Sequence, residues 1–168
     1  MIITYEDLSR IRKENPDKKI VMLKGTFDLF HMGHLNMIRR AKALGDILVV
    51  LVKCDEAIKL KGPDRPIEDE QQRASIVDAI RYVDYTLIAD RKIDAGIPDV
   101  PEEDRMQYLR YYQLVSVLRP DVLIKPSKKL PDILMKLYNE IGTEIHEVEE
   151  TKGVSTTLLI KKIRESRN

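Results

Sequence analysis

The sequence has little cysteine and no long apolar run. Cys54 is its only cysteine, so no internal disulfide can form and a disulfide-stapled secreted scaffold is excluded. The longest apolar run, Ile47 to Val52, is too short to span a membrane. The first residues carry an acidic pair with no basic segment before it, unlike a signal peptide. We therefore expect a cytoplasmic protein that has no membrane partner.

The sequence also lacks an excess of charge of one sign. Its 29 Lys and Arg residues nearly balance its 28 Asp and Glu residues, leaving a formal net charge of +1. This balance excludes binding of nucleic acid or another polyanion through bulk charge. Any anionic ligand must therefore be held by a local cluster of basic groups.

Short apolar runs alternate with helical patterns along the chain. We predict strands at 19–24, 46–52, 82–88, 121–125 and 144–148. We predict the main helices at 33–44, 68–80, 102–118, 130–141 and 155–164, with Gly45 as the C-cap of the first. This alternation is typical of an α/β, Rossmann-like fold with a doubly wound parallel sheet of five strands and helices on both faces. We expect one domain over 1–168, with an N-terminal helical appendage at 1–18 and an extended loop-helix insertion at 90–118.

The loop after the first predicted strand carries two histidines beside two glycines. Ligands of such sheets bind beyond the carboxyl ends of the strands. Gly25 would let the chain turn off the strand, and Gly33 would let a ligand approach closely. His31 and His34 are three residues apart at a helix start, so they share a face near free backbone N–H groups. The arrangement suits a phosphoryl group that gains charge; a pair of packed core histidines is the weaker alternative.

Metal binding by this histidine pair is not expected. A zinc site would need a third protein ligand and an open position. The remaining histidine, His146, falls in a predicted strand, away from the loop after Gly25. We therefore predict no metal ligands in this chain.

Residues 25–34, Gly-Thr-Phe-Asp-Leu-Phe-His-Met-Gly-His, resemble the signature of the cytidylyltransferase-like nucleotidyltransferases. That family includes glycerol-3-phosphate cytidylyltransferase, archaeal FAD synthetase and the adenylyltransferase domain of ADP-heptose synthase. Residues 60–67 are similar to the Lys-Gly-x-x-Arg-Pro stretch of the last of these, and residues 152–157 to the family's Gly-x-Ser-Thr-Ser/Thr motif. The resemblance extends over residues 19–164.

The resemblance implies three groups of site residues. For two of them, Ser155 and Thr156, a simple helix N-cap is the alternative interpretation of the hydroxyl groups. The catalytic residues it implies are His31, His34 and Lys61. The nucleotide-binding residues it implies are Gly25, Thr26, Phe27, Gly33, Arg73, Gly153, Ser155 and Thr156. The residues implied to bind the second substrate are Asp28, Lys53, Asp55 and Lys125.

The implied reaction transfers a nucleotidyl group from a nucleoside triphosphate to the phosphate of a small sugar or polyol phosphate and releases pyrophosphate. Mg²⁺ would be carried with the triphosphate, and the family suggests a homodimer. ATP is slightly favoured by residues 60–67, and CTP is the alternative. Glu150 and residues 125–129 depart from the family pattern. They leave open a second alternative, a nucleotide-binding sensor without turnover.

Overall fold

The computed structural model describes residues 1–59, 64–89, 112–125, 130, 132–148 and 151–166. The strands are β1 (Ile2–Ile3), β2 (Ile20–Gly25), β3 (Ile47–Lys53), β4 (Tyr85–Ala89), β5 (Val122–Lys125) and β6 (Glu144–Glu147). The helices are α1 (Tyr5–Glu14), α2 (Met32–Lys42), α3 (Asp55–Lys59), α4 (Glu70–Asp78), α6 (Asp132–Ile141) and α7 (Thr156–Glu165), and residues 112–118 are also helical. Within these ranges, no helix has the length and apolarity needed to cross a membrane.

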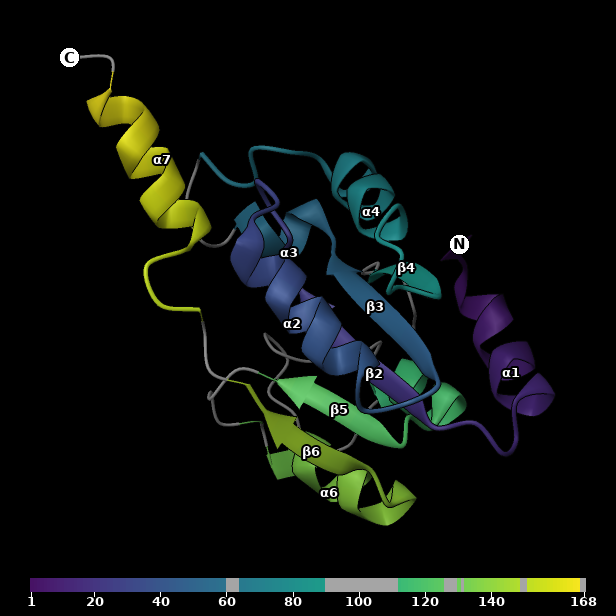
Figure 1. The fold of residues 1–168 in the computed structure, drawn as a ribbon. Helices are drawn as coiled ribbons and strands as arrows, with labels where there is room; N and C mark the ends of the chain where they lie inside the picture. Colours follow the sequence, from purple (N-terminus) through teal and green to yellow (C-terminus); the bar gives the residue numbers. More distant parts are fainter. Residues whose placement is uncertain (60–63, 90–111, 126–129, 131, 149–150, 167–168) are drawn as a thin grey trace.

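The strands form one parallel sheet in the order β1-β4-β3-β2-β5-β6 (Figure 1). The chain runs from β2 outward to β4 and then returns to the other side of β2 at β5. The α/β, doubly wound fold is therefore confirmed, whereas the prediction of five strands is wrong because β1 adds a sixth. β1 pairs Ile2 with Thr86 and Ile3 with Leu87, and two residues are too few to show strand periodicity in a sequence.

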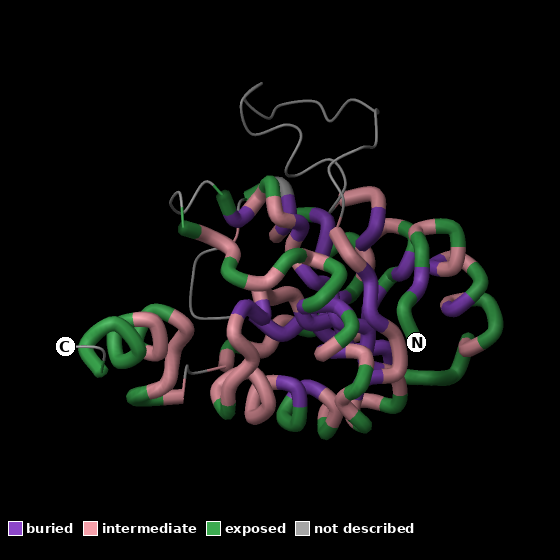
Figure 2. The backbone as a smooth tube through the Cα atoms, turned by 90° about the horizontal axis from the view of Figure 1, so that it is seen from above, coloured by how far each residue is buried: buried purple, intermediate pink, exposed green. Residues whose placement is uncertain are grey.

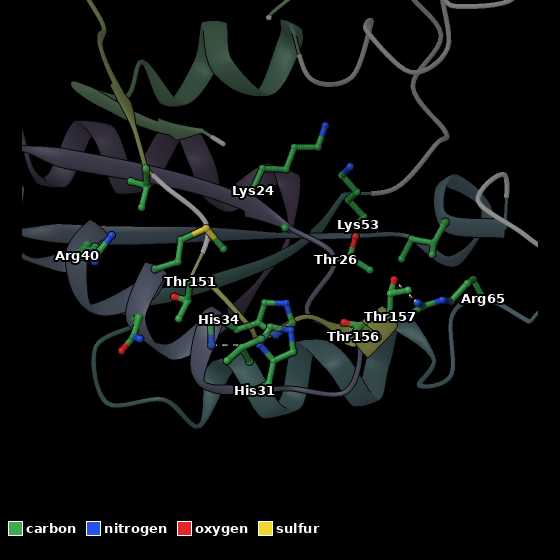
Figure 3. Close-up of a pocket in the computed structure, with 17 residues that line it drawn as sticks. Lys24, Thr26, His31, His34, Arg40, Lys53, Arg65, Thr151, Thr156 and Thr157 are labelled. Carbon is green, nitrogen blue, oxygen red and sulfur yellow. Dashed lines mark hydrogen bonds between the residues drawn. The ribbon is translucent and has the colours of Figure 1, made fainter. Parts of the chain in front are cut away.

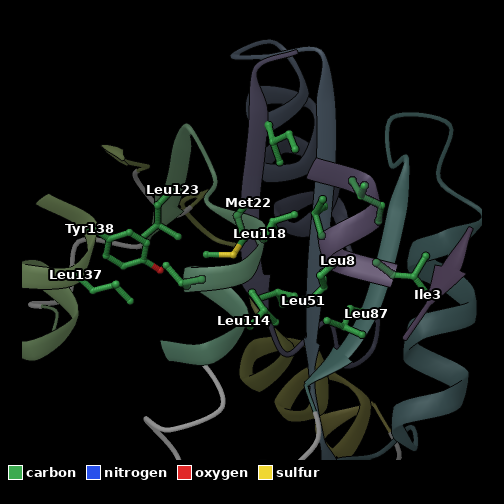
Figure 4. Close-up of a cluster of buried hydrophobic side chains, with 14 of the residues drawn as sticks. Ile3, Leu8, Met22, Leu51, Leu87, Leu114, Leu118, Leu123, Leu137 and Tyr138 are labelled. Atoms are coloured by element: carbon green, nitrogen blue, oxygen red, sulfur yellow. The ribbon is translucent and has the colours of Figure 1, made fainter. Parts of the chain in front are cut away.

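Two apolar layers cover the two faces of the sheet. On one face Met22 and Leu51 pack in a buried cluster with α1, α6 and the helical residues 112–118 (Figure 4). On the other face Leu23 and Val52 pack in a second cluster with α2 and α4. Figure 2 shows the buried backbone concentrated in the central part of the molecule, whereas α7 has no buried residue. Because successive side chains of a strand alternate between faces, these layers fix the side on which each strand-end residue lies.

The N-terminal segment 1–18 is built into the fold rather than appended to it. Its strand β1 pairs with β4. Leu8 and Ile11 of α1 are buried in the cluster that contains Met22 and Leu51. Of the predicted insertion at 90–118, residues 90–111 lie outside the described residues. Residues 112–118 are helical, and three apolar side chains, Leu114, Val115 and Leu118, are buried in the same cluster.

The predicted role of Gly45 as a C-cap is wrong. Helix α2 ends at Lys42, and Ala43 caps it in a right-handed conformation. A Cβ atom on Gly45 would lie 2.6 Å from the carbonyl oxygen of Lys19, so this glycine is needed for close backbone approach. Helix α3 was also not expected, because its five residues precede a stretch rich in turn residues.

Candidate active site

A cavity of about 460 Å³ lies beyond the carboxyl ends of β2 and β3 (Figure 3). Its walls come from β2 and the loop after it, α2, the end of β3, α3, the loop before α4, and the segment leading into α7. The lining residues are Lys24, Gly25, Thr26, His31, Gly33, His34, Asn36, Met37, Arg40, Lys53, Ile58, Arg65, Val148, Thr151, Val154, Thr156 and Thr157. This is the edge at which ligands bind in doubly wound sheets.

His31 starts helix α2 and orients its own ring. Its backbone is extended, and its Nδ1 accepts a hydrogen bond of 3.1 Å from the backbone N–H of Gly33. The neutral ring therefore carries its proton on Nε2, which is a donor. A Cβ atom on Gly33 would lie 2.9 Å from Cε1 of His31, so the glycine makes room for the imidazole as well as for a ligand.

His34 stacks on His31 at 3.8 Å between ring centroids. The rings of Phe27 and Phe30 lie 5.3 and 5.5 Å from it, and its Nδ1 has no hydrogen-bond partner among the described residues. Burial, together with the neighbouring His31, lowers the pKa of His34 to about 4, against a smaller opposing effect of Asp28. Burial also lowers the pKa of His31. Both imidazoles are therefore neutral at neutral pH in the ligand-free protein.

The start of α7 packs against the loop that follows β2. Thr156 donates a hydrogen bond from its hydroxyl to the carbonyl oxygen of Asp28 at 2.8 Å, and Thr157 accepts one from Arg65 at 3.2 Å. Ser155 caps the helix by accepting from the backbone N–H of Leu158. Thr156 and Thr157 line the cavity, so the first turn of α7 brings hydroxyls and a positive dipole end to its wall.

Asp28 does not line the cavity, in contrast to its predicted contact with the second substrate. Its carboxylate is buried and accepts hydrogen bonds from Arg65 at 3.0 Å and from the backbone N–H groups of Ile67 and Glu68 at 3.0 and 3.1 Å. These contacts occupy both carboxylate oxygens. Asp28 therefore anchors the loop before α4 and holds Arg65 at the cavity wall.

Arg73 is also placed differently from its predicted contact with the nucleotide. Its guanidinium is fully buried and donates to the backbone carbonyls of Thr26, Lys53 and Glu68 at 2.6, 2.8 and 2.9 Å. It also donates to the carboxylate of Asp55 at 2.6 Å, so Asp55 is its ion-pair partner and not a cavity residue. Arg73 clamps the ends of β2 and β3 to α4, which keeps the cavity edge in place.

The other predicted residues fall into two groups. Gly25, Thr26, Gly33, Lys53 and Thr156 line the cavity with the two histidines. Phe27, Gly153, Ser155 and Lys125 do not line it, and Lys61 lies outside the described residues. Phe27 is fully buried with a left-handed backbone (φ 58°), and its ring fills the space where a Cβ of Gly25 would sit, 2.7 Å away. Lys125 is nearly buried in an ion pair with Glu147.

Sequence reasoning missed several cavity residues, above all Lys24 and Arg40. Lys24 lies at the end of an apolar strand. A charged residue directly after a run of apolar residues was the signal in the sequence that could have marked this position as functional. Burial and the charge of Lys53 lower the pKa of Lys24 to about 8, although Cys54 acts in the opposite direction. Arg40 lies on α2 two turns after Gly33, so only the helix orientation reveals that it faces the cavity.

In the described part of the chain, no group of three or more His, Cys, Asp or Glu side chains is placed to hold a metal ion. Among the residues that the structure describes, the charged side chains that line the cavity are cations, namely Lys24, Arg40, Lys53 and Arg65. The arrangement is therefore suited to binding anionic groups.

Comparison with known proteins identifies the family. The profile of the cytidylyltransferase-like family matches residues 22–162. The bifunctional protein HldE of Campylobacter jejuni is 34% identical over 167 residues, which is 99% of this chain and 32% of that protein. The HldE of Helicobacter pylori is 37% identical over 158 residues, or 92% of this chain and 30% of that protein. The chain thus spans about a third of the length of these relatives.

Solved structures share the fold. A lipopolysaccharide core biosynthesis protein of Thermoplasma volcanium matches with a TM-score of 0.56 and 26% identity, covering 82% of this chain and 99% of that one. A pantothenate synthetase of Thermus thermophilus matches with a TM-score of 0.63 and 16% identity, covering 98% and 70%, and this similarity is one of fold alone. The family profile spans most of the sequence and includes the histidine loop, so the chain belongs to the cytidylyltransferase-like family of nucleotidyltransferases.

Proposed function

We propose that this chain transfers a nucleotidyl group from a magnesium–nucleoside triphosphate to the phosphate of a small sugar or polyol phosphate. The observation that carries the proposal is a single cavity that joins the His31–His34 stack, the first turn of α7 and a lining of cations. This combination can bind a triphosphate and stabilise charge that develops on it. Membership of the family and the similarity to HldE proteins support the same reaction class.

The reaction needs positioning more than acid–base chemistry. An oxygen of the acceptor phosphate attacks the α-phosphorus, the bond from that phosphorus to the bridging oxygen breaks, and pyrophosphate leaves in line. The attacking oxygen is already anionic, so no strong base is required. The protein must hold two anions together and neutralise the charge that accumulates in the transition state.

The two imidazoles are suited to a role at the α-phosphate. His31 is held by its bond from Gly33 with Nε2–H as the donor, and His34 stacks on it. Both rings are neutral before binding, and a bound triphosphate would favour their protonated forms because opposite charge raises the pKa of an imidazole. Their stabilisation therefore increases as negative charge develops on the leaving group.

The β- and γ-phosphates would lie at the start of α7. Thr156 and Thr157 line the cavity there, and Arg65 is held beside them by Asp28. Lys61, four residues before Arg65 in the sequence, is proposed as a further cation for these phosphates. Mg²⁺ would enter with the triphosphate as part of the substrate, neutralising phosphate charge while the side chains position it.

ATP is the preferred nucleotide in this proposal, and CTP is the alternative. The similarity of residues 60–67 to the Lys-Gly-x-x-Arg-Pro stretch supports ATP. The acceptor is proposed as a class, a small sugar or polyol phosphate.

A panel of the four nucleoside triphosphates against sugar and polyol phosphates, read by pyrophosphate release, tests the proposal. Release that requires both one triphosphate and one phosphorylated acceptor supports it. A variant with both His31 and His34 changed to alanine is the control for contaminating activity. Tight nucleotide binding without release over the panel would instead support a sensor, and a protein that binds no nucleotide would refute both.

A further inference from the structure

One wall of the cavity, here called the lysine wall, is made by Lys24 and Lys53 at the ends of two neighbouring strands. β2 and β3 pair in parallel with Lys24 opposite Leu51 and Gly25 opposite Val52. Leu51 packs in the apolar layer of α1 and α6, whereas Val52 packs in the layer of α2. By strand alternation, Lys24 and Lys53 therefore lie on the face of the sheet away from α2.

The imidazoles and the ammonium groups thus face the cavity from opposite sides of the sheet edge. His31 and His34 belong to α2, on the other face. Figure 3 shows Lys24 and Lys53 together on one side of the cavity and the two imidazoles on the other. A molecule that fills the cavity would contact both walls.

The start of α7 packs against the histidine side of the cavity. Thr156 bonds to the loop that follows β2, and the carbonyl oxygen of Val154 lies 3.6 Å from the position of a Cβ on Gly33. A triphosphate held by His31 and the first turn of α7 would leave the lysine wall for the second substrate. That placement would let the acceptor approach the triphosphate from the side of the cavity opposite the start of α7.

Two lysines in one partly buried place repel each other. Burial and Lys53 lower the pKa of Lys24 to about 8, so an anion bound beside it would favour its charged form. A phosphate monoester carries close to two negative charges at neutral pH, as judged from the second ionisation of phosphorylated side chains, whereas a carboxylate carries one. The charge of two ammonium groups therefore matches that of a phosphate monoester better than that of a carboxylate.

We propose that Lys24 and Lys53 form the acceptor subsite, hold the phosphate whose oxygen attacks, and select a dianionic phosphate over a carboxylate. The inference rests on the proposed function, since it assigns the second substrate of the same cavity. Lys125, at the end of β5, is engaged with Glu147 and does not line the cavity. The subsite is therefore built from β2 and β3.

Calorimetric titration of the full chain with inorganic phosphate tests this assignment, using protein saturated with magnesium and a non-hydrolysable analogue of the active triphosphate. We expect phosphate to bind. We expect acetate at the same concentration not to change the affinity for phosphate. Lys24→Gln and Lys53→Gln should each weaken phosphate binding by about tenfold or more, because each removes a charge-assisted hydrogen bond. Affinity for the analogue should change by less than about threefold. Lys136→Gln, an exposed lysine on α6, should change neither.

Other outcomes overturn the assignment in distinguishable ways. If both variants lost as much affinity for the analogue as for phosphate, the two lysines would be assigned to triphosphate binding. Failure of the wild-type protein to bind phosphate would reject the subsite even if pyrophosphate release demonstrates turnover. Phosphate binding that depends on both lysines, without turnover over the acceptor panel, would retain the subsite and reject the transfer reaction. Lys24→Met and Lys53→Met replace either glutamine variant that fails a thermal-unfolding check.

Discussion

The imidazole rings of His31 and His34 are stacked, with 3.8 Å between their centroids and 17° between their planes. Two protonated rings at this distance would repel each other, so charging one opposes charging the second. The triphosphate of the proposed function would change this balance, because its negative charge would attract both rings. Under that proposal, substrate binding would favour protonation of the two stacked imidazoles.

The stability of the ligand-free protein should fall in acid because of His34. Its pKa is lowered from 6.5 to about 4 on folding, so below pH 6.5 the unfolded state binds more protons than the folded state. This contribution is complete above about pH 6.5 and is lost as the pH falls towards 4, at a cost of up to about 3 kcal/mol. Urea unfolding at pH 7.5 and 4.5 measures it. The His34→Gln variant should lose less stability over that interval, and an equal loss in both proteins would contradict the argument.

Replacing His34 should slow the reaction more than it weakens nucleotide binding. His34→Asn removes a group whose help increases in the transition state, so we expect kcat to fall about 100- to 1,000-fold. Nucleotide affinity should change by less than about tenfold. Steady-state kinetics together with equilibrium nucleotide binding separate the two effects. His146→Asn, on β6 and away from the cavity, is the matched control, and parallel losses of rate and affinity in His34→Asn would contradict the assigned role.

Gly33→Ala should displace the His31 ring. The added methyl group would lie 2.9 and 3.0 Å from Cε1 and Nδ1 of that ring, closer than packed atoms tolerate. We expect about 1–3 kcal/mol of destabilisation and a lower kcat, measured by urea unfolding and kinetics. Gly142→Ala, where no atom lies within 4 Å but φ is +76°, should also destabilise the fold but leave kcat unchanged. Unaltered kcat in Gly33→Ala would show that ring placement is not critical.

Asp28 should matter for folding and Arg65 for the substrate. Asp28→Ala leaves Arg65 and two backbone N–H groups without their buried acceptor, so we expect a loss of about 3–5 kcal/mol in unfolding free energy. Arg65→Gln should cost about 1–3 kcal/mol and should raise the KM for the triphosphate. Unfolding curves and KM measurements compare the two variants. A stable Asp28→Ala protein with a raised acceptor KM would restore the predicted substrate contact.

The sequence was most informative where a pattern repeats over many residues. The strands around Val21 and Val50 are continuous apolar runs, and such runs separated by helices predict a parallel sheet without further information. β1 escaped prediction because two residues have no period, and Gly45 was misassigned because its neighbour in space, Lys19, is distant in the sequence. Local patterns cannot report such contacts.

The same distinction between local patterns and long-range contacts applies to the candidate site. His31, Gly33 and His34 were predicted because they lie within one turn of one helix, so their spacing alone brings them together. Asp28 and Arg73 were predicted to touch substrates, yet both hold loops. A charged residue next to a motif has the same sequence signature whether it contacts the ligand or fixes the backbone that does.

The sequence by itself determined the class of fold, the family and the histidine pair, because periodicity and short motifs are properties of neighbouring residues. Only the tertiary structure decided that Lys24 and Lys53 share a wall of the cavity and that Arg65 stands beside α7. The physical reason is that these groups meet through strand pairing and helix packing between segments far apart in the chain. These side chains come close enough together to act on one ligand only after the sheet has formed.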